Sequence, residues 1–171
     1  MNAYVALLRA VNVGGTGKLP MAALVAMCVD AGFSDVRTYI ASGNVVFRSR
    51  SDEATVRDAL AHRLQAHAGK PVGVLVRSAA EIADVVRSNP FPQAAGNRVV
   101  ALFVDGPLPG DPLQGVTGRT AEQLALGPRA LYVHYGEGMA DSKLRIPCAA
   151  QGTGRNLNTV VRLAAMAAAL A

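Results

Sequence analysis

The order of strand-like and helix-like segments at the start of this sequence constrains its fold more than any other feature. An apolar run at residues 3–11 predicts a mostly buried strand, and a helical pattern of apolar residues follows it. Two β-branched segments, residues 36–41 and 44–47, predict a hairpin. A second helical pattern and a strand at residues 72–76 complete the order β-α-β-β-α-β. This order is the split β-α-β pattern of a ferredoxin-like half, a sheet with helices on one face.

The rest of the chain repeats this order in a degenerate form. A buried strand at residues 98–106 leads into a proline-rich loop and then into a hairpin around Gly127. We expect a helix to begin near Lys143, although Pro147 would break or restart it. The last helix is expected over residues 159–170, where apolar side chains form one stripe.

We therefore predict an α+β fold in which two ferredoxin-like halves pack as one compact unit. The first half is residues 1–77, and a helix and linker follow at residues 78–97. That helix opens with a capping box of Ser78 and Glu81. The degenerate second half, with its C-terminal helix, is residues 98–171. Since 51% of the residues are hydrophobic, the chain can fill an interior without disulfides.

Cysteine usage and apolar runs indicate the compartment. Cys28 and Cys148 lie in apolar surroundings without CxxC spacing, so neither a disulfide framework nor a zinc site is expected. The first residues lack the basic region and cleavage site of a signal peptide. The apolar run at residues 163–171 is far shorter than the ~18 residues of a membrane span. We expect a cytoplasmic protein without a membrane partner.

The charge of the chain is positive and uneven. The net charge is +5, and no acidic residue follows Asp141, whereas Lys143, Arg145, Arg155 and Arg162 do. A local excess of basic residues attracts phosphates and polyanions. An excess of this size is also what ordinary solubility requires, so both explanations stay open.

A glycine-rich segment at residues 12–18 is the first motif that suggests a ligand. Its main-chain N–H groups can approach a phosphate, and Lys18 can neutralise one. It is not a Walker loop, because Asn12 stands where a glycine belongs and Leu19 follows the lysine. It is not a dinucleotide fingerprint either, because Pro20 takes the place of the last glycine. The alternative is a flexible turn between a strand and a helix.

Two further polar segments have both a functional and a structural interpretation. The hairpin turn at residues 42–44 would place a hydroxyl and an amide beside the glycine-rich segment, but a turn uses such residues anyway. Residues 154–159 precede the final helix, whose first N–H groups favour an anion that Arg155 would clamp. Asparagine is also the commonest helix cap, which would explain the asparagines there.

Motifs of hydrolases and metal sites are absent from the sequence. Ser142 and Lys143 are adjacent, which is the wrong spacing for SxxK, and His62 and His67 lie five apart on a helix and face different directions. GxSxG, HExxH and paired carboxylates do not occur, so we predict no metal site and no cofactor. The strand at residues 98–106 lacks the aromatic pattern of RNA-binding sheets.

Four sequence motifs resemble those of a known family. They are LLRAVNVGG at residues 7–15 with KLPM following, GFSDVRTYIASGNVVF at 32–47, LYVHYGEG and SKL within 131–144, and RNLNTV at 155–160. They are similar to a mainly bacterial family catalogued as domain of unknown function 1697. The resemblance implies a duplicated ferredoxin-like architecture and no established activity. The family usually has a tryptophan after the Arg-Asn pair, where this chain has Leu157.

The polar and glycine positions of these motifs are our candidate ligand-binding residues. Our leading hypothesis is a binding module for an anionic ligand, a nucleotide or a nucleic-acid backbone, held by Lys18, Lys143 and Arg155. One alternative is a small enzyme acting on a phosphorylated or carboxylated metabolite, with Ser42 or Ser142 as a catalytic group. Another is a protein-protein interaction domain, with a homodimer as one form. The candidates are Arg9, Asn12, Gly14, Gly15, Lys18, Ser42, Asn44, Ser142, Lys143, Arg155, Asn156 and Asn158.

Overall fold

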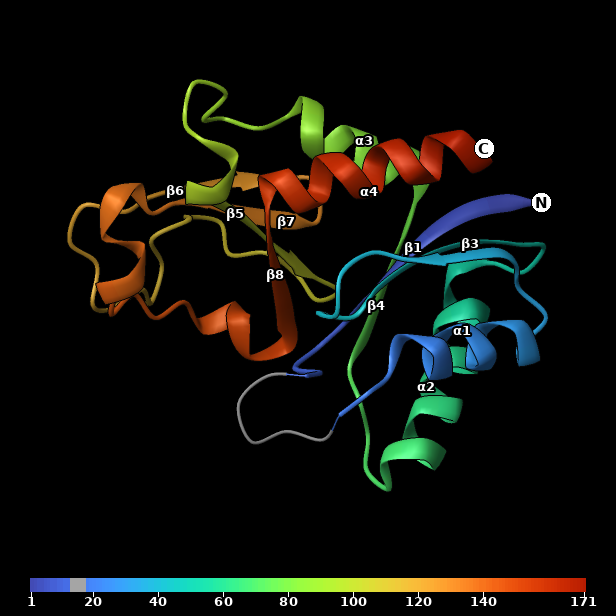
Figure 1. Cartoon of the computed structure of the whole chain (residues 1–171). Coiled ribbons are helices and arrows are strands. Elements are labelled where there is room, and N and C mark those ends of the chain that lie inside the picture. Colours follow the sequence, from blue (N-terminus) through green and yellow to red (C-terminus); the bar gives the residue numbers. More distant parts are fainter. Residues whose placement is uncertain (13–17) are drawn as a thin grey trace. The chain divides into compact units, whose positions relative to one another are not determined.

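The computed structural model of the chain describes residues 1–12 and 18–171 (Figure 1). These residues form two four-stranded antiparallel sheets, each associated with helices. The α+β fold with two halves is therefore confirmed. None of the helices in these residues has the length and apolar character that crossing a bilayer requires.

The contacts within the chain divide it into two units. Residues Met1–Ile82 and Leu163–Ala171 form the first unit, and residues Ala83–Arg162 form the second. Helix α3 (Ala79–Arg87) and helix α4 (Leu157–Leu170) each have residues in both units. The first unit is thus built from two separate stretches of sequence.

The first unit has the predicted order of elements. Its sheet has the strand order β2-β3-β1-β4, and every neighbouring pair is antiparallel. Strand β1 ends at Leu8, three residues before the end of the apolar run that predicted it. The elements are β1 (Asn2–Leu8), α1 (Met21–Asp30), β2 (Ser34–Thr38), β3 (Asn44–Ser49), α2 (Glu53–Ala68) and β4 (Val74–Ser78).

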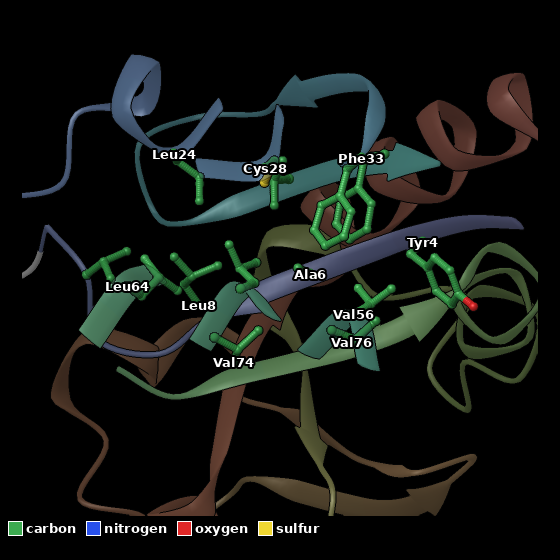
Figure 2. Close-up of a cluster of buried hydrophobic side chains, with 14 of the residues drawn as sticks. Tyr4, Ala6, Leu8, Leu24, Cys28, Phe33, Val56, Leu64, Val74 and Val76 are labelled. Carbon is green, nitrogen blue, oxygen red and sulfur yellow. The ribbon is translucent and has the colours of Figure 1, made fainter. Parts of the chain in front are cut away.

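The core of the first unit lies between its sheet and helices α1 and α2. Alternate residues of β1, namely Tyr4, Ala6 and Leu8, are buried among apolar side chains of both helices (Figure 2). The rings of Phe33 and Phe47 stack in this core with their centroids 4.3 Å apart. The residues between them, Ala3, Val5 and Leu7, are buried as well, as expected of a mostly buried strand with a continuous apolar sequence.

Local capping fixes where the helices begin and end. Asp52 caps α2 by accepting a 2.8 Å hydrogen bond from the Thr55 N–H, and Gly69 ends that helix with a φ of 73°. The predicted capping box opens α3, since Glu81 accepts from the Ser78 N–H at 2.9 Å and Ser78 accepts from the Glu81 N–H at 3.2 Å.

The second unit repeats the strand order of the first. Its sheet runs β6-β7-β5-β8 and is antiparallel throughout, so each sheet holds its strands in the same relative chain order. The predicted hairpin joins β6 to β7. The elements are the 3-10 helix η1 (Gly96–Arg98), β5 (Val99–Val104), β6 (Gln123–Gly127), β7 (Ala130–His134), the 3-10 helices η2 (Gly136–Asp141) and η3 (Pro147–Gln151), and β8 (Gly152–Asn156).

Two sequence predictions for this unit need correction. The helix expected near Lys143 is wrong: residues 142–146 form no helix, because Arg145 makes two main-chain hydrogen bonds with Thr117, of 3.1 and 2.8 Å. Strand β8 was not predicted, because its polar, glycine-rich sequence lacks the alternation of a half-buried strand. A Cβ at Gly152 would lie 2.4 Å from the Phe103 oxygen, so glycine allows β8 to approach β5.

Candidate anion-binding cavity

The first unit contains a cavity of about 610 Å³. Its walls come from the segment that follows β1, the C-terminal end of α2 and the segment that leads into β4. Strands β1 and β4 are antiparallel neighbours, so the end of one lies beside the start of the other. This topology brings together residues that are about sixty positions apart in the sequence.

The cavity is lined by basic residues and by no acidic one among the residues described. Its basic residues are Arg9, Lys18, His67 and Lys70, and the side chains of all four are exposed. Like charges gathered in a concave site raise the local concentration of counter-ions. The cavity therefore has the electrostatic character of an anion site.

The β1–β4 pairing positions Arg9. The Arg9 N–H donates to the Gly73 oxygen at 2.9 Å, next to the pair that Leu8 forms with Val74. A Cβ at Gly73 would lie 3.1 Å from the Arg9 Cβ, which is closer than most Cβ contacts. The absence of a side chain at residue 73 thus leaves room for the alkyl stem of Arg9 along the cavity wall.

Asn12 anchors the residue that follows Lys18. Its Oδ1 accepts from the Leu19 N–H at 2.6 Å, and its Nδ2 donates to the Leu19 oxygen at 2.9 Å and to the Ala41 oxygen at 2.7 Å. Asn12 has a φ of 56°, a left-handed conformation that asparagine tolerates better than most residues. The side-chain polar atoms of Asn12 thus form hydrogen bonds with the main chain. Asn12 therefore positions Lys18 and does not line the cavity.

The end of α2 supplies His67 and Lys70. Gly69 turns the chain out of the helix, with its N–H donating to the Gln65 oxygen at 2.9 Å. A helix C-terminus carries roughly half a negative charge, which attracts nearby cations. This partial negative charge is smaller than the unit positive charge of Lys70 alone, so the cavity remains positive.

Ser42 and Asn44 hold the β2–β3 turn and are not among the cavity residues. Asn44 is fully buried, and its Nδ2 donates to the Tyr39 oxygen and to the Ser42 Oγ, both at 3.0 Å. This matches the structural interpretation of the turn. The candidates Gly14 and Gly15 fall outside the described residues.

The remaining candidates belong to the second unit, and none of them lines the cavity of the first. Ser142 donates a hydrogen bond to the buried carboxylate of Glu122. The Ser142 hydroxyl and the Thr120 N–H lower the pKa of Glu122 to about 2. Such a carboxylate is a weak base near neutral pH, so it does not activate Ser142 as a nucleophile. The adjacent Lys143 is exposed.

Arg155 and its neighbours support the structure of β8 and α4. Arg155 is 8% exposed and donates to the Thr153 Oγ1 at 2.6 Å and to the Gly154 oxygen at 3.0 Å. Burial lowers its pKa to about 10. Asn156 accepts from the Thr159 N–H at 2.9 Å and so caps α4. Asn158 packs on Gly96 so closely that a Cβ there would overlap its amide.

Sequence reasoning missed the basic cavity residues His67 and Lys70, and it also missed Gly73, which leaves room for the Arg9 stem. None belongs to a recognisable motif, because their role depends on position in the fold. The split β-α-β pattern carried the necessary signal: antiparallel pairing of the first and last strands places the residue before β4 beside the residue after β1.

Comparisons with known proteins agree with this fold. The solved structure of conserved bacterial protein SP0830 from Streptococcus pneumoniae is similar, with a TM-score of 0.79 over 96% of this chain and 98% of that one, at 23% identity. At this identity the likeness shows the fold alone. No curated protein matches the sequence. The family model described as "Protein of unknown function (DUF1697)" matches residues 1–132, which include every cavity residue. The chain therefore belongs to the DUF1697 family.

Proposed function

We propose that this protein binds a phosphate-bearing anionic ligand in the cavity of its first unit. The observation that carries the proposal is the set of four basic residues around one cavity that has no acidic residue in its described lining. The cavity volume of about 610 Å³ lies within the range of roughly 300–1,000 Å³ typical of small-molecule sites.

The basic residues offer two kinds of contact. Arg9 presents a planar guanidinium that can donate two parallel hydrogen bonds to one phosphate. Lys18 and Lys70 act as point charges from different walls of the cavity, one before α1 and one after α2. A phosphate between them would be held from more than one direction.

The residues of the proposed site differ from those expected from the sequence. The sequence suggested Lys18, Lys143 and Arg155, but only Lys18 lines the cavity. The guanidinium of Arg155 is buried and donates to Thr153 and Gly154. Arg9 and Lys70 take the places of Lys143 and Arg155 in the proposed site.

We also propose a cytoplasmic location and a ferredoxin-like origin for both halves. Cys28 and Cys148 are both free thiols, which is typical of proteins from reducing compartments. The two sheets share one strand order, and in the second unit loops and 3-10 helices replace the two helices that link the strands of the first. A duplication followed by loss of helices accounts for both observations.

Isothermal titration calorimetry with inorganic phosphate and pyrophosphate tests the proposed site. Arg9→Gln and Lys70→Gln should each weaken binding roughly ten- to a hundredfold, the range for losing one hydrogen bond to a charged group. Lys143→Gln removes the same charge from an exposed position in the second unit and should leave affinity unchanged. Equal losses in all three variants would show that net charge, not the cavity, attracts the anion.

Salt-titrated fluorescence anisotropy with short labelled DNA and RNA separates a small ligand from a polyanion. A polyanion would engage several phosphates, so its affinity would fall steeply with salt. If Arg9→Gln and Lys70→Gln leave tight oligonucleotide binding unchanged, nucleic acid binds elsewhere on the protein. That result would contradict the proposal that the cavity is the anion-binding site.

A further inference from the structure

We infer that the main chain of Ala10 and Val11 binds the phosphate in this cavity, with its N–H groups as hydrogen-bond donors. The inference rests on the proposed function and assigns a second set of binding groups to the same site. The basic side chains supply charge, whereas the main-chain N–H groups fix the orientation of the phosphate.

Ala10 and Val11 line the cavity directly after the pairing of β1 with β4 ends. The last hydrogen bond of this pairing runs from the Arg9 N–H to the Gly73 oxygen. Among the described residues, none accepts a hydrogen bond from the N–H of Ala10 or Val11, and none accepts from the N–H of Asn12. Three consecutive donors therefore follow the strand without an acceptor in the described part of the chain.

Donors without an acceptor need a physical explanation in a folded protein. Roughly 90% or more of buried N–H groups have a hydrogen-bond partner, because an unmade bond costs the desolvation of the donor. Val11 is only 6% exposed, and Ala10, which is exposed, lies on the cavity wall. A ligand oxygen in the cavity would supply the acceptor that the described residues do not.

The main chain of this segment is also strained. Ala10 and Asn12 have left-handed φ angles of 55° and 56°, whereas Val11 between them is not left-handed. Asparagine tolerates this conformation, but alanine has no polar side chain to compensate for its cost. Residues of alternating hand form anion-binding nests, in which successive N–H groups converge on one anion. Strain of this kind is concentrated at ligand-binding sites.

The donors and the charges belong to the same cavity. Arg9 directly precedes Ala10, and Lys18 and Lys70 line the cavity from other segments. Coulombic attraction to these side chains has little directional preference. A hydrogen bond from an N–H group is directional and is shorter and stronger when the acceptor oxygen is ionised. The two sets of groups together would attract a phosphate and orient its oxygens.

Nuclear magnetic resonance with added inorganic phosphate tests the inference. A hydrogen bond to an anion moves an amide proton downfield, and protection from water slows its exchange. We expect both changes at Ala10 and Val11 as the cavity fills. Ile40 is the control, because its φ of 52° is also left-handed but it does not line the cavity. Its amide proton should show neither change.

Each result has a distinct meaning. If calorimetry shows that phosphate binds while the amide protons of Ala10 and Val11 stay in place, side chains alone hold the ligand. That result would overturn the inference and leave the proposed function standing. If phosphate does not bind at all, both are overturned. If saturated Arg9→Gln still shows the two downfield shifts, the main chain binds phosphate without the guanidinium, as we infer.

Ala10→Gly is a second test, with affinity as its readout. Glycine adopts a left-handed φ without strain, so the variant should have a Tm no lower than that of the wild type. The ligand must then order a freer main chain, so phosphate affinity should fall about two- to fivefold. Ile40→Gly makes the matched change outside the cavity lining and should leave the affinity unchanged. Equal affinity of the two variants would overturn the binding role of the main chain at Ala10.

Discussion

The side-chain amide of Asn12 pairs with both main-chain polar groups of Leu19. Its Oδ1 accepts from the Leu19 N–H at 2.6 Å, and its Nδ2 donates to the Leu19 oxygen at 2.9 Å. The Nδ2 also reaches the Ala41 oxygen at 2.7 Å in the turn between β2 and β3. One side chain thus connects the exit of β1, the approach to α1 and the hairpin.

We expect Asn12→Asp to destabilise the protein by about 2 kcal/mol, because it removes two hydrogen bonds and turns a carboxylate oxygen toward two carbonyls. Aspartate keeps the size of asparagine and tolerates the left-handed backbone at residue 12. Urea unfolding followed by circular dichroism measures the change. Asn2→Asp, at an exposed position, is the control. If the two variants unfold at the same urea concentration, the Asn12 pairing does not stabilise the fold.

Gly43 and Gly32 offer a matched test of steric exclusion. Both have left-handed φ angles, of 86° and 88°. A Cβ at Gly43 would lie 2.6 Å from the Val11 Cγ2 and 2.9 Å from the Leu8 Cβ, whereas a Cβ at Gly32 has nothing within 4 Å. We expect Gly32→Ala to cost about 1–2 kcal/mol from backbone strain alone, and Gly43→Ala about 2–5 kcal/mol. Equal free energies of unfolding for Gly43→Ala and Gly32→Ala would refute close packing at the hairpin turn.

Glu122 should make the second unit sensitive to acid. Its pKa falls from the ordinary 4.5 to about 2, chiefly through the Ser142 hydroxyl and the Thr120 N–H. Its contribution to stability is therefore complete above about pH 4.5 and is lost as the pH falls toward 2. The difference in Tm between the wild type and Glu122→Gln should shrink over this window. Glu137→Gln, at an exposed position, should show no such pH-dependent difference.

The two thiols should differ in reactivity. Cys28 is fully buried, and burial raises its pKa to about 12, while Cys148 is half-buried with a pKa raised to a lesser extent by the same cause. Only thiolates react quickly with Ellman's reagent. In the native protein we expect one thiol to react, and to react slowly. Cys148→Ala should abolish this reaction, and in denaturant both thiols of the wild type should react. If Cys28 reacted as fast as Cys148, the core of the first unit would have to open readily.

Most of the fold could be predicted from the sequence because its strands and helices are strongly patterned. The pair Ser78 and Glu81 marked the start of a helix by local chemistry that needs no tertiary context. Strand β8 could not be predicted, because its stability comes from pairing with β5, about fifty residues away in sequence. Pairing between strands so far apart cannot be predicted from the local sequence.

The candidate site was only partly predictable for a similar reason. Arg9 and Lys18 lie in a motif and line the cavity, but their basic partners His67 and Lys70 lie where α2 ends and β4 approaches. Arg155 looked like a ligand clamp because its sequence precedes a helix. Its guanidinium instead donates within β8, a contact that depends on an unpredicted strand.

The division of the chain also orders events during synthesis. Residues Leu163–Ala171 belong to the first unit, yet all of Ala83–Arg162 is translated before them. Domains commonly fold from the N-terminus onward as they leave the ribosome. Here the unit whose synthesis begins first is completed last, because its final stretch, Leu163–Ala171, follows the whole of the second unit. A premature stop late in the message would therefore remove residues from the unit whose synthesis began first.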